Sequence, residues 1–312
     1  MTTIDVDAGT DRRLWRPLAS GVAGMVVVGS SVGVSRALTD APLFTAQAIR
    51  YAAATVILLL LAKALGVSIH RPRGREWCWL IGVAVTGLVI FNVAVVRGVA
   101  HAEPAVIAVA VACAPVLISV IGPLLEGRRP TPRLLAAAAV VTAGSVLVAG
   151  TGRADPVGVI WAVVALCCEA GFTLLAVPVL RRLGPWGVSV HAVWIAAVML
   201  AVMAVITEGP TAAALLEPDH WAAIGYLAVM VTAVAFLLWY SAVAALGSAR
   251  AGLLTGVAPV AAAVSGAMLG AGLPGVPVWA GMLLVVCGLA VGLVGRSGRR
   301  TCSGVGRTGG GG

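Results

Sequence analysis

The sequence predicts an all-α integral membrane protein in which ten transmembrane helices form two inverted five-helix repeats. Three observations support this fold class, namely the composition, a series of separated apolar runs, and an internal duplication. Of the 312 residues, 60% are hydrophobic and only 11% are charged, whereas a soluble domain averages about 25% charged residues. So few charged residues cannot cover the exterior of a soluble fold, which excludes an ordinary soluble enzyme. A disordered chain is also excluded, because disordered chains are poor in apolar residues.

Apolar runs define the ten helices in chain order. Crossing the hydrocarbon core takes roughly 20 apolar residues in a helix, and backbone polar groups in hydrocarbon must be hydrogen-bonded within the protein. The runs are continuously apolar, whereas the strands of a membrane barrel alternate between apolar and polar residues, so each run is predicted to be a helix. The predicted spans cover residues 18–35, 43–64, 78–96, 105–125, 133–150, 157–179, 186–206, 221–245, 251–270 and 277–295.

The two ends of the chain differ from the apolar runs between them. Residues 1–16 are polar, and residues 297–312 are rich in glycine and arginine, so both are predicted to be disordered cytoplasmic tails. Arg12 and Arg13 precede the first apolar run, as in a secretion signal. Because nine more apolar runs follow, we predict that the first run is retained as a helix.

Charged residues between the runs orient the helices. If the first tail lies in the cytoplasm, 17 of the 21 basic residues fall in cytoplasmic tails and loops, as the positive-inside rule requires. Six acidic residues then fall at the outer ends of the spans. We therefore predict a multi-pass protein with both termini in the cytoplasm. Twenty arginines against one lysine are typical of a GC-rich bacterial genome, so the expected membrane is the bacterial plasma membrane.

The sequence lacks motifs for nucleic-acid binding, metal binding and enzymatic chemistry. Its net charge of +9 comes from short loop clusters without interleaved aromatic residues, so we predict no nucleic-acid partner. The six cysteines show neither a CxxC spacing nor a Cys/His ligand pattern, so we predict no metal site and no cofactor. The sequence contains no P-loop, GxSxG elbow or HExxH helix, so we predict a protein that is not an enzyme.

The chain is duplicated with an offset of 144 residues. This offset aligns the APV tripeptide at 114–116 with the APV tripeptide at 258–260. We therefore predict a first repeat over residues 17–150 and a second repeat over residues 157–296. Five spans per repeat is an odd number, so the second repeat must be inverted relative to the first. Inverted repeats are typical of secondary transporters, which bind their substrate near the bilayer midplane between the two halves.

The fourth and fifth predicted spans carry the pattern APVLISVIGPLLEGRRPTPRLLAAAAVVTAGSVLV. Together with the ten spans and the duplication, this pattern resembles the drug/metabolite transporter superfamily, specifically proteins with two EamA-type repeats. In that family a mid-helix proline is followed by a glutamate at the helix end and by a glycine in the next helix. Pro115, Glu126 and Gly144 occupy these places. In the second repeat Pro259 and Gly288 match, but a glycine replaces the glutamate.

The resemblance implies a secondary transporter of small organic solutes, such as amino acids, metabolites or drugs. We expect export by proton-coupled alternating access, with a small-molecule solute, protons and the lipid bilayer as partners. Three alternatives stay open: an uncoupled facilitator, a membrane-embedded transferase that acts on lipid-linked substrates, and a scaffold that transports nothing. The resemblance leaves the substrate and the oligomeric state open.

Glu169 is the first candidate for the substrate or proton site. Ionisable groups inside spans are costly and are functional candidates by default. At ~1.5 Å per residue, Glu169 lies about 18 Å into the sixth span, where desolvation favours the neutral carboxyl group. It can therefore exchange a proton or pair with a cationic group of the substrate. Related small multidrug exporters resemble this arrangement, since they carry a membrane-embedded glutamate in their first helix. The alternative is a structural carboxyl group that is hydrogen-bonded to a neighbouring helix.

Arg50 and Gln47 are the second pair of candidates. Arg50 lies some eight residues inside the second span, and Gln47, three residues earlier, lies on the same helix face. An arginine that faces a cavity can hold a carboxylate through two parallel hydrogen bonds. The alternative is an arginine that reaches the outer surface or binds a loop carbonyl.

Four further side chains are candidates for the lining of the cavity. His191 lies about two turns into the seventh span and can relay protons, although a hydrogen-bonded packing role fits the same position. Asn92 is a polar side chain in the third span. Trp239 and Tyr240 lie deeper than the Trp and Tyr residues that anchor helices at membrane interfaces, so we predict that they line the cavity.

Two prolines are predicted to be helix hinges. Pro115 and Pro259 lie inside predicted spans, where each removes a backbone donor and loosens the helix locally. In a transporter such a point lets the helix bend during alternating access. A static kink is the structural alternative.

Overall fold

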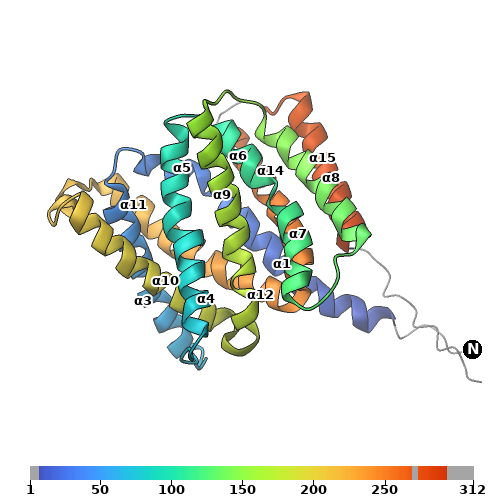
Figure 1. Cartoon of the computed structure of the whole chain (residues 1–312), viewed down its shortest axis with the longest axis horizontal. Coiled ribbons are helices and arrows are strands. Elements are labelled where there is room, and N and C mark those ends of the chain that lie inside the picture. Colours follow the sequence, from blue (N-terminus) through green and yellow to red (C-terminus); the bar gives the residue numbers. More distant parts are fainter. Residues whose placement is uncertain (1–6, 269–272, 294–312) are drawn as a thin grey trace, which may run out of the picture.

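The computed structural model describes residues 7–268 and 273–293 of the chain. Within these residues the chain is almost entirely helical and has no β-strand. Ten helical spans in the described part are long and apolar enough to cross a membrane, and they pack into one bundle (Figure 1). The predicted all-α fold class with ten spans is confirmed. Residues 1–6 and 297–312 of the predicted tails lie outside the described residues.

The first repeat supplies spans 1 to 5. α1 begins at Asp7, inside the segment predicted to be a disordered tail, because a helix that has already nucleated extends at little cost beyond its apolar run. In order, the five spans are formed by α1 (Asp7–Ser30) with α2 (Val32–Ser35), followed by the short 3-10 helix η1 (Arg36–Leu38); α3 (Leu43–Ala64); α4 (Glu76–Val83), η2 (Ala84–Ile90) and α5 (Phe91–Val99); α6 (Pro104–Ala112) and α7 (Ala114–Leu125); and α8 (Pro132–Ala149).

The second repeat supplies spans 6 to 10. In order, these are formed by α9 (Pro156–Leu174); α10 (Val177–Thr207), followed by the 3-10 helix η3 (Ala212–Leu215); α11 (Pro218–Tyr226), η4 (Leu227–Ala235) and α12 (Phe236–Leu246); α13 (Ser248–Leu253), η5 (Leu254–Gly256) and α14 (Val257–Gly266); and α15 (Val276–Leu293). α10 starts earlier than the predicted seventh span and is broken at Gly184, whose φ is 68°. The part before Gly184 is a short helix that connects spans 6 and 7.

Spans 3 and 8 each contain a π-helical segment, namely η2 and η4. Adding the offset of 144 to Ala84, the first residue of η2, gives position 228, which lies inside η4. The two segments therefore occupy equivalent places in the two repeats. π-helical turns are rare and are frequently found at functional sites.

The two ends of the bundle differ in charge. We call the end that carries loops 65–75, 126–131 and 175–184 the basic end, and the end that carries loops 36–42, 100–103, 150–155 and 208–217 the acidic end. Arginines such as Arg128 and Arg182 lie at the basic end, whereas Glu208 lies at the acidic end.

The packing of α8 against α15 shows the two-fold relation between the repeats (Figure 1). A Cβ atom on Gly144 would lie 2.6 Å from the carbonyl oxygen of Gly281, and a Cβ atom on Gly288 would lie 3.1 Å from that of Ala137. Because 281 minus 144 is 137 and 288 minus 144 is 144, the second contact is the repeat-related copy of the first. Both helices need small residues here, since their backbones approach closely.

Candidate functional site

A cavity of about 510 Å³ lies between the two repeats. This volume is within the range of about 300–1,000 Å³ that is common for small-molecule sites. Among the described residues, its lining comes from spans 1 to 5 of the first repeat and from spans 6, 8 and 9 of the second. Both π-helical segments contribute, through Gly87 and Leu88 of η2 and through Val231 and Ala235 of η4.

The cavity lies in the part of the bundle nearer the acidic end. Its lining includes Val32 of α2 and Ala149, the last residue of α8, and both of these residues lie close to that end. In spans 6 and 8, the lining residues toward the basic end are Phe172, Phe236 and Trp239. These aromatic side chains form the floor of the cavity.

The floor is fixed by ring packing and hydrogen bonds. The ring centroids of Phe172 and Phe236 are 4.9 Å apart, and those of Phe172 and Tyr240 are 5.2 Å apart. Trp239 donates its Nε1 proton to Oγ1 of Thr173 at 3.2 Å. Tyr240 is fully buried and donates to the carbonyl of Phe172 at 3.2 Å. Trp239 therefore lines the cavity, whereas Tyr240 lies behind the floor and supports it.

Arg50 lines the cavity and is held in place by side chains from both repeats. Its Nε donates to Oγ1 of Thr232 at 2.9 Å, and its Nη1 donates to Oε1 of Gln47 at 3.3 Å. Its guanidinium carbon lies 5.2 Å from the ring centroid of Tyr51. A guanidinium has five N–H groups, so the two hydrogen bonds leave donors for a ligand. Arg50 has no ion pair with a carboxylate in the described part of the chain.

Glu169 lines the same cavity from the other repeat. Its carboxylate makes neither a hydrogen bond nor an ion pair with any described residue, although Tyr240 and Cys168 lie close enough to interact with it electrostatically. A charged side chain in an apolar environment is costly unless it is paired or neutralised. The cavity thus presents a cation and a carboxyl group that the protein itself leaves without a charged partner.

Asn92 is the remaining polar candidate that lines the cavity. Its amide donates to the carbonyl of Leu88 at 2.6 Å and to the hydroxyl of Tyr51 at 3.1 Å. It therefore connects the π-helical segment of span 3 to span 2. Through Tyr51, this connection reaches the residue next to Arg50.

His191 lies outside the cavity lining, near the basic end. Its Nε2 donates to the carbonyl of His70 at 3.2 Å, and its Nδ1 accepts the Nε1 proton of Trp194 at 3.0 Å. The carbonyl can only accept and the indole can only donate, which fixes the neutral imidazole with its proton on Nε2. Trp77 packs edge-on against the imidazole of His191, with the two ring centroids 5.9 Å apart. These contacts are those of a packing histidine.

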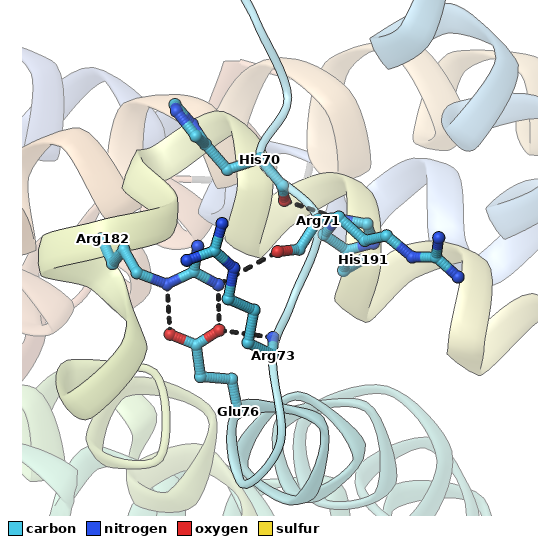
Figure 2. Close-up of polar contacts among 6 residues, drawn as sticks. All are labelled: His70, Arg71, Arg73, Glu76, Arg182 and His191. Carbon is cyan, nitrogen blue, oxygen red and sulfur yellow. Dashed lines mark hydrogen bonds and ion pairs between the residues drawn. The ribbon is translucent and has the colours of Figure 1, made fainter.

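The loop beside His191 is fastened to the bundle by an ion pair (Figure 2). Arg182 of α10 binds the carboxylate of Glu76 through two nitrogen atoms. The same guanidinium donates to the carbonyl of Arg71, and the backbone N–H of Arg73 donates to Glu76 at 2.7 Å. This cluster joins the connection between spans 2 and 3 to the short helix that connects spans 6 and 7.

The two predicted hinges lie next to breaks in equivalent spans. Span 4 is broken at Cys113, two residues before Pro115, and span 9 is broken at the 3-10 helix η5, just before Pro259. Pro259 lines the cavity, whereas Pro115 is buried away from it. Both prolines lie in the first turn of the following helix, where a missing N–H costs little.

The sequence did not single out Thr232, Thr255 or the π-helical segments, although all of them contribute to the site. A threonine in an apolar span gives no signal of what it faces, because its hydroxyl can bond to its own helix. For Tyr51, by contrast, the sequence does give a signal of its contact with Arg50, because the two residues are adjacent in the chain. Among the described residues, no group of three or more His, Cys, Asp or Glu side chains is placed to hold a metal ion.

Comparison with known proteins defines the class to which this fold and cavity belong. The chain matches the EamA-like transporter family twice, over residues 17–150 and 156–294. It is therefore a member of the EamA-like transporter family, a class of multi-pass membrane transporters built from two repeats. This agrees with the resemblance found in the sequence.

Individual relatives support the same class. The chain is 30% identical over 230 residues to the "Probable terminal-alkyne amino-acid exporter" of Streptantibioticus cattleyicolor. The matched region covers 71% of this chain and 74% of the relative. It is 24% identical over 256 residues to the "Uncharacterized transporter YetK" of Bacillus subtilis, covering 79% and 78% of the two chains. A solved structure titled "Crystal structure of protein" has the same fold, with a TM-score of 0.75, 21% identity, and coverage of 90% and 98%.

Proposed function

We propose that this protein is a secondary transporter of the bacterial plasma membrane that exports small zwitterionic solutes of the amino-acid type. In this proposal the basic end faces the cytoplasm, and the two repeats alternate access to the cavity between them. The observation that carries the proposal is the presence of Arg50 and Glu169 in one cavity without a charged protein partner. The relative from Streptantibioticus cattleyicolor, which is named as a probable amino-acid exporter, supports the same substrate class.

Each charged side chain has a distinct role in this proposal. Arg50 binds the substrate carboxylate, because Thr232 and Gln47 hold the guanidinium while leaving N–H donors free. Glu169 binds the substrate ammonium group or, in its absence, a proton. A carboxyl group that alternates between these two ligands couples export of the solute to entry of a proton. The apolar walls and the aromatic floor accommodate the substrate side chain.

Transport in proteoliposomes tests the proposal. Purified protein is reconstituted with a pH-sensitive dye inside, and amino acids, cationic drugs and uncharged metabolites are added under an imposed pH gradient. Zwitterionic amino acids are expected to drive proton movement with the wild-type protein and not with Glu169→Gln. His191→Gln is the matched control, since His191 lies outside the cavity lining.

Two outcomes contradict parts of the proposal. Radiolabelled amino acid that equilibrates without proton movement, equally in wild type and Glu169→Gln, assigns an uncoupled facilitator and a structural Glu169. Proton movement driven by cationic drugs, with amino acids inactive, overturns the substrate class. Orientation is tested separately by the accessibility of an epitope tag after Gly312 in intact cells, which is expected to be protected.

A further inference from the structure

A carboxylate at the basic end joins the two repeats. Glu126 follows the last residue of α7 in the first repeat, and its Oε1 accepts two hydrogen bonds from the first residue of α13 in the second repeat. The backbone N–H of Ser248 lies at 2.8 Å and the Ser248 hydroxyl at 2.6 Å. The residue before α13 is Gly247, which has no side chain to cap the helix. Glu126 therefore satisfies from another span the N–H group that a helix start leaves free.

The same helices pack tightly next to this contact. A Cβ atom on Gly122 would lie 2.2 Å from the Ser248 hydroxyl oxygen, and one on Gly252 would lie 2.7 Å from the side chain of Ile118. Ser248 and Ile118 are both buried, with exposed fractions of 0%. Spans 4 and 9 are thus in direct contact at the basic end.

On the acidic-end side of their breaks, spans 4 and 9 are formed by α6 and α14, which are separated by the cavity. Ala108 and Ala112 of α6 and Ala258 and Ala262 of α14 all line the cavity, so the two helices form separate walls there. Each span is broken near its middle, at Cys113 and at η5. The close contact between the described parts of spans 4 and 9 is thus made by α7 and α13, which are the parts that Glu126 joins.

Two hollows flank the contact at the basic end. One has a volume of about 310 Å³ and the other about 710 Å³. Glu126, Gly247, Arg128 and Arg250 line both of them. Glu126, which accepts the hydrogen bonds from Ser248, therefore borders both hollows.

We propose that Glu126 is a positioning residue for transport: its bond to Ser248 holds α7 against α13, keeps the basic end closed, and breaks when the cavity opens at that end. The proposal rests on the alternating access stated under the proposed function. When the bond breaks, Arg128 receives the freed carboxylate, since its Nη1 already lies 3.6 Å from Oε2 of Glu126.

The acidic end has a carboxylate with the same chemistry, which provides a control. There Glu208 accepts hydrogen bonds from the backbone N–H groups of Phe44 and Thr45, both at 2.8 Å, and from the Thr45 hydroxyl at 2.7 Å.

Cysteine accessibility tests the proposal without requiring a substrate. In a background with the six native cysteines replaced by alanine, Ile118→Cys reports on the α7–α13 contact. Ala54→Cys reports on general loosening, because Ala54 is fully buried in α3. The rate of reaction with a membrane-impermeant maleimide is measured in detergent for both reporters. Each is combined with Glu126→Ala, Glu126→Gln and Glu208→Ala.

Opening of the basic end is expected to appear at Ile118→Cys alone. A hydrogen bond to a charged group contributes about 1.5–3 kcal/mol, so Glu126→Ala is expected to raise the labelling rate roughly 10- to 100-fold. Glu126→Gln keeps a neutral acceptor and is expected to give a smaller increase than Glu126→Ala. With Glu208→Ala the rate is expected to stay within about twofold of the parent, because α3 and α10 pack together along their length and need no single bond to stay in contact.

Three results overturn the proposal. These are an unchanged rate in Glu126→Ala, an equal increase in Glu208→Ala, and an increase at Ala54→Cys as large as that at Ile118→Cys. Failure of the substrate assignment leaves the labelling pattern unchanged, because no solute is present in the assay. Failure of the proposal in turn leaves the transport experiment with Glu169→Gln interpretable.

Discussion

Spans 2 and 7 carry the same local arrangement at equivalent positions, with different chemistry. In span 2 Arg50 donates to Gln47 at 3.3 Å, and in span 7 Trp194 donates to His191 at 3.0 Å. Adding 144 to 47 and 50 gives 191 and 194, so the acceptor and the donor three residues later recur in both repeats. Arg50 of the first pair lines the cavity, whereas the second pair lies near the basic end, where His191 contacts the carbonyl of His70.

The difference between the two pairs shows that duplication preserves the local hydrogen bond, whereas inversion changes its surroundings. The duplication copies a helix and a hydrogen bond between two of its turns. The inversion then turns the copy toward the opposite end of the bundle, where it meets a loop instead of a cavity. A charge is useful only at the first place, since an arginine without a carboxylate partner is retained where a ligand can neutralise it. Trp194 and His191 satisfy each other and need no ligand.

The largest effect is expected at Arg50, the charged residue of the two equivalent pairs. Arg50→Gln removes the carboxylate contact, and a hydrogen bond to a charged group contributes about 1.5–3 kcal/mol, so substrate affinity is expected to fall roughly 10- to 100-fold. Trp194→Phe removes the equivalent donor at the other end and is expected to leave affinity within about twofold, because span 7 is absent from the lining of the cavity among the described residues. Binding of zwitterionic amino acids to purified protein, by calorimetry, measures both. Equal losses in the two variants would remove the functional distinction between the pairs.

A second prediction concerns the seam between α8 and α15, where the repeats do match. In Gly144→Ala the added Cβ lies 2.6 Å from the carbonyl oxygen of Gly281, and such overpacking costs about 1–3 kcal/mol. The unfolding temperature of purified protein is therefore expected to fall. Gly225→Ala is the control, because a Cβ there meets nothing within 4 Å and alanine favours the helix. A stable Gly144→Ala variant would mean that the seam separates easily.

The smallest expected effect lies in the link between the repeats. Asp155 caps α9 by accepting the backbone N–H of Gly158 at 2.7 Å, and its other oxygen lies 2.9 Å from Nδ1 of His101. The hydrogen bond from Gly158, followed by that from His101, lowers the pKa of Asp155 below its ordinary value of 3.8. The contribution of this carboxylate to stability is therefore present above pH 3.8 and is lost as the pH falls through the lowered pKa.

Asp155→Asn tests the sign of this effect. At pH 7 the variant is expected to unfold at a slightly lower temperature than wild type, and the difference is expected to shrink below pH 3.8. The measurement is thermal unfolding of detergent-solubilised protein at several pH values. Asp40→Asn, in another loop of the acidic end, is the matched control. A difference that grows toward low pH would contradict the assignment.

Much of the fold follows from the sequence because the bilayer restricts the choices. Apolar runs must become helices in hydrocarbon, and the 144-residue offset predicted that Gly144 and Gly288 occupy equivalent positions in the two repeats. Arg50 and Glu169 were found because charged residues stand out in apolar runs. That both line one cavity is observed in the structure, whereas their roles in binding remain proposals.

Other features depend on contacts between distant segments, which local patterns do not encode. In the sequence, Arg128 and Arg129 are the nearest charged neighbours of Glu126, and its carboxylate does lie 3.6 Å from Arg128. Its shorter hydrogen bonds, however, go to Ser248, 122 residues away. Tyr240 was placed in the lining by its depth, but depth does not determine the direction of a side chain. The π-helical segments were also missed, since a continuously apolar run has no periodicity in which one added residue per turn would show.

The reciprocal glycine contacts of α8 and α15 have a consequence for how the two halves of the gene can change. Each helix contributes a glycine that faces the backbone of the other, so the available space is shared between two codons in different repeats. A larger side chain on one helix can be accepted only if the facing residue becomes smaller or the helices move apart. Sequence drift at this seam is therefore coupled between the halves.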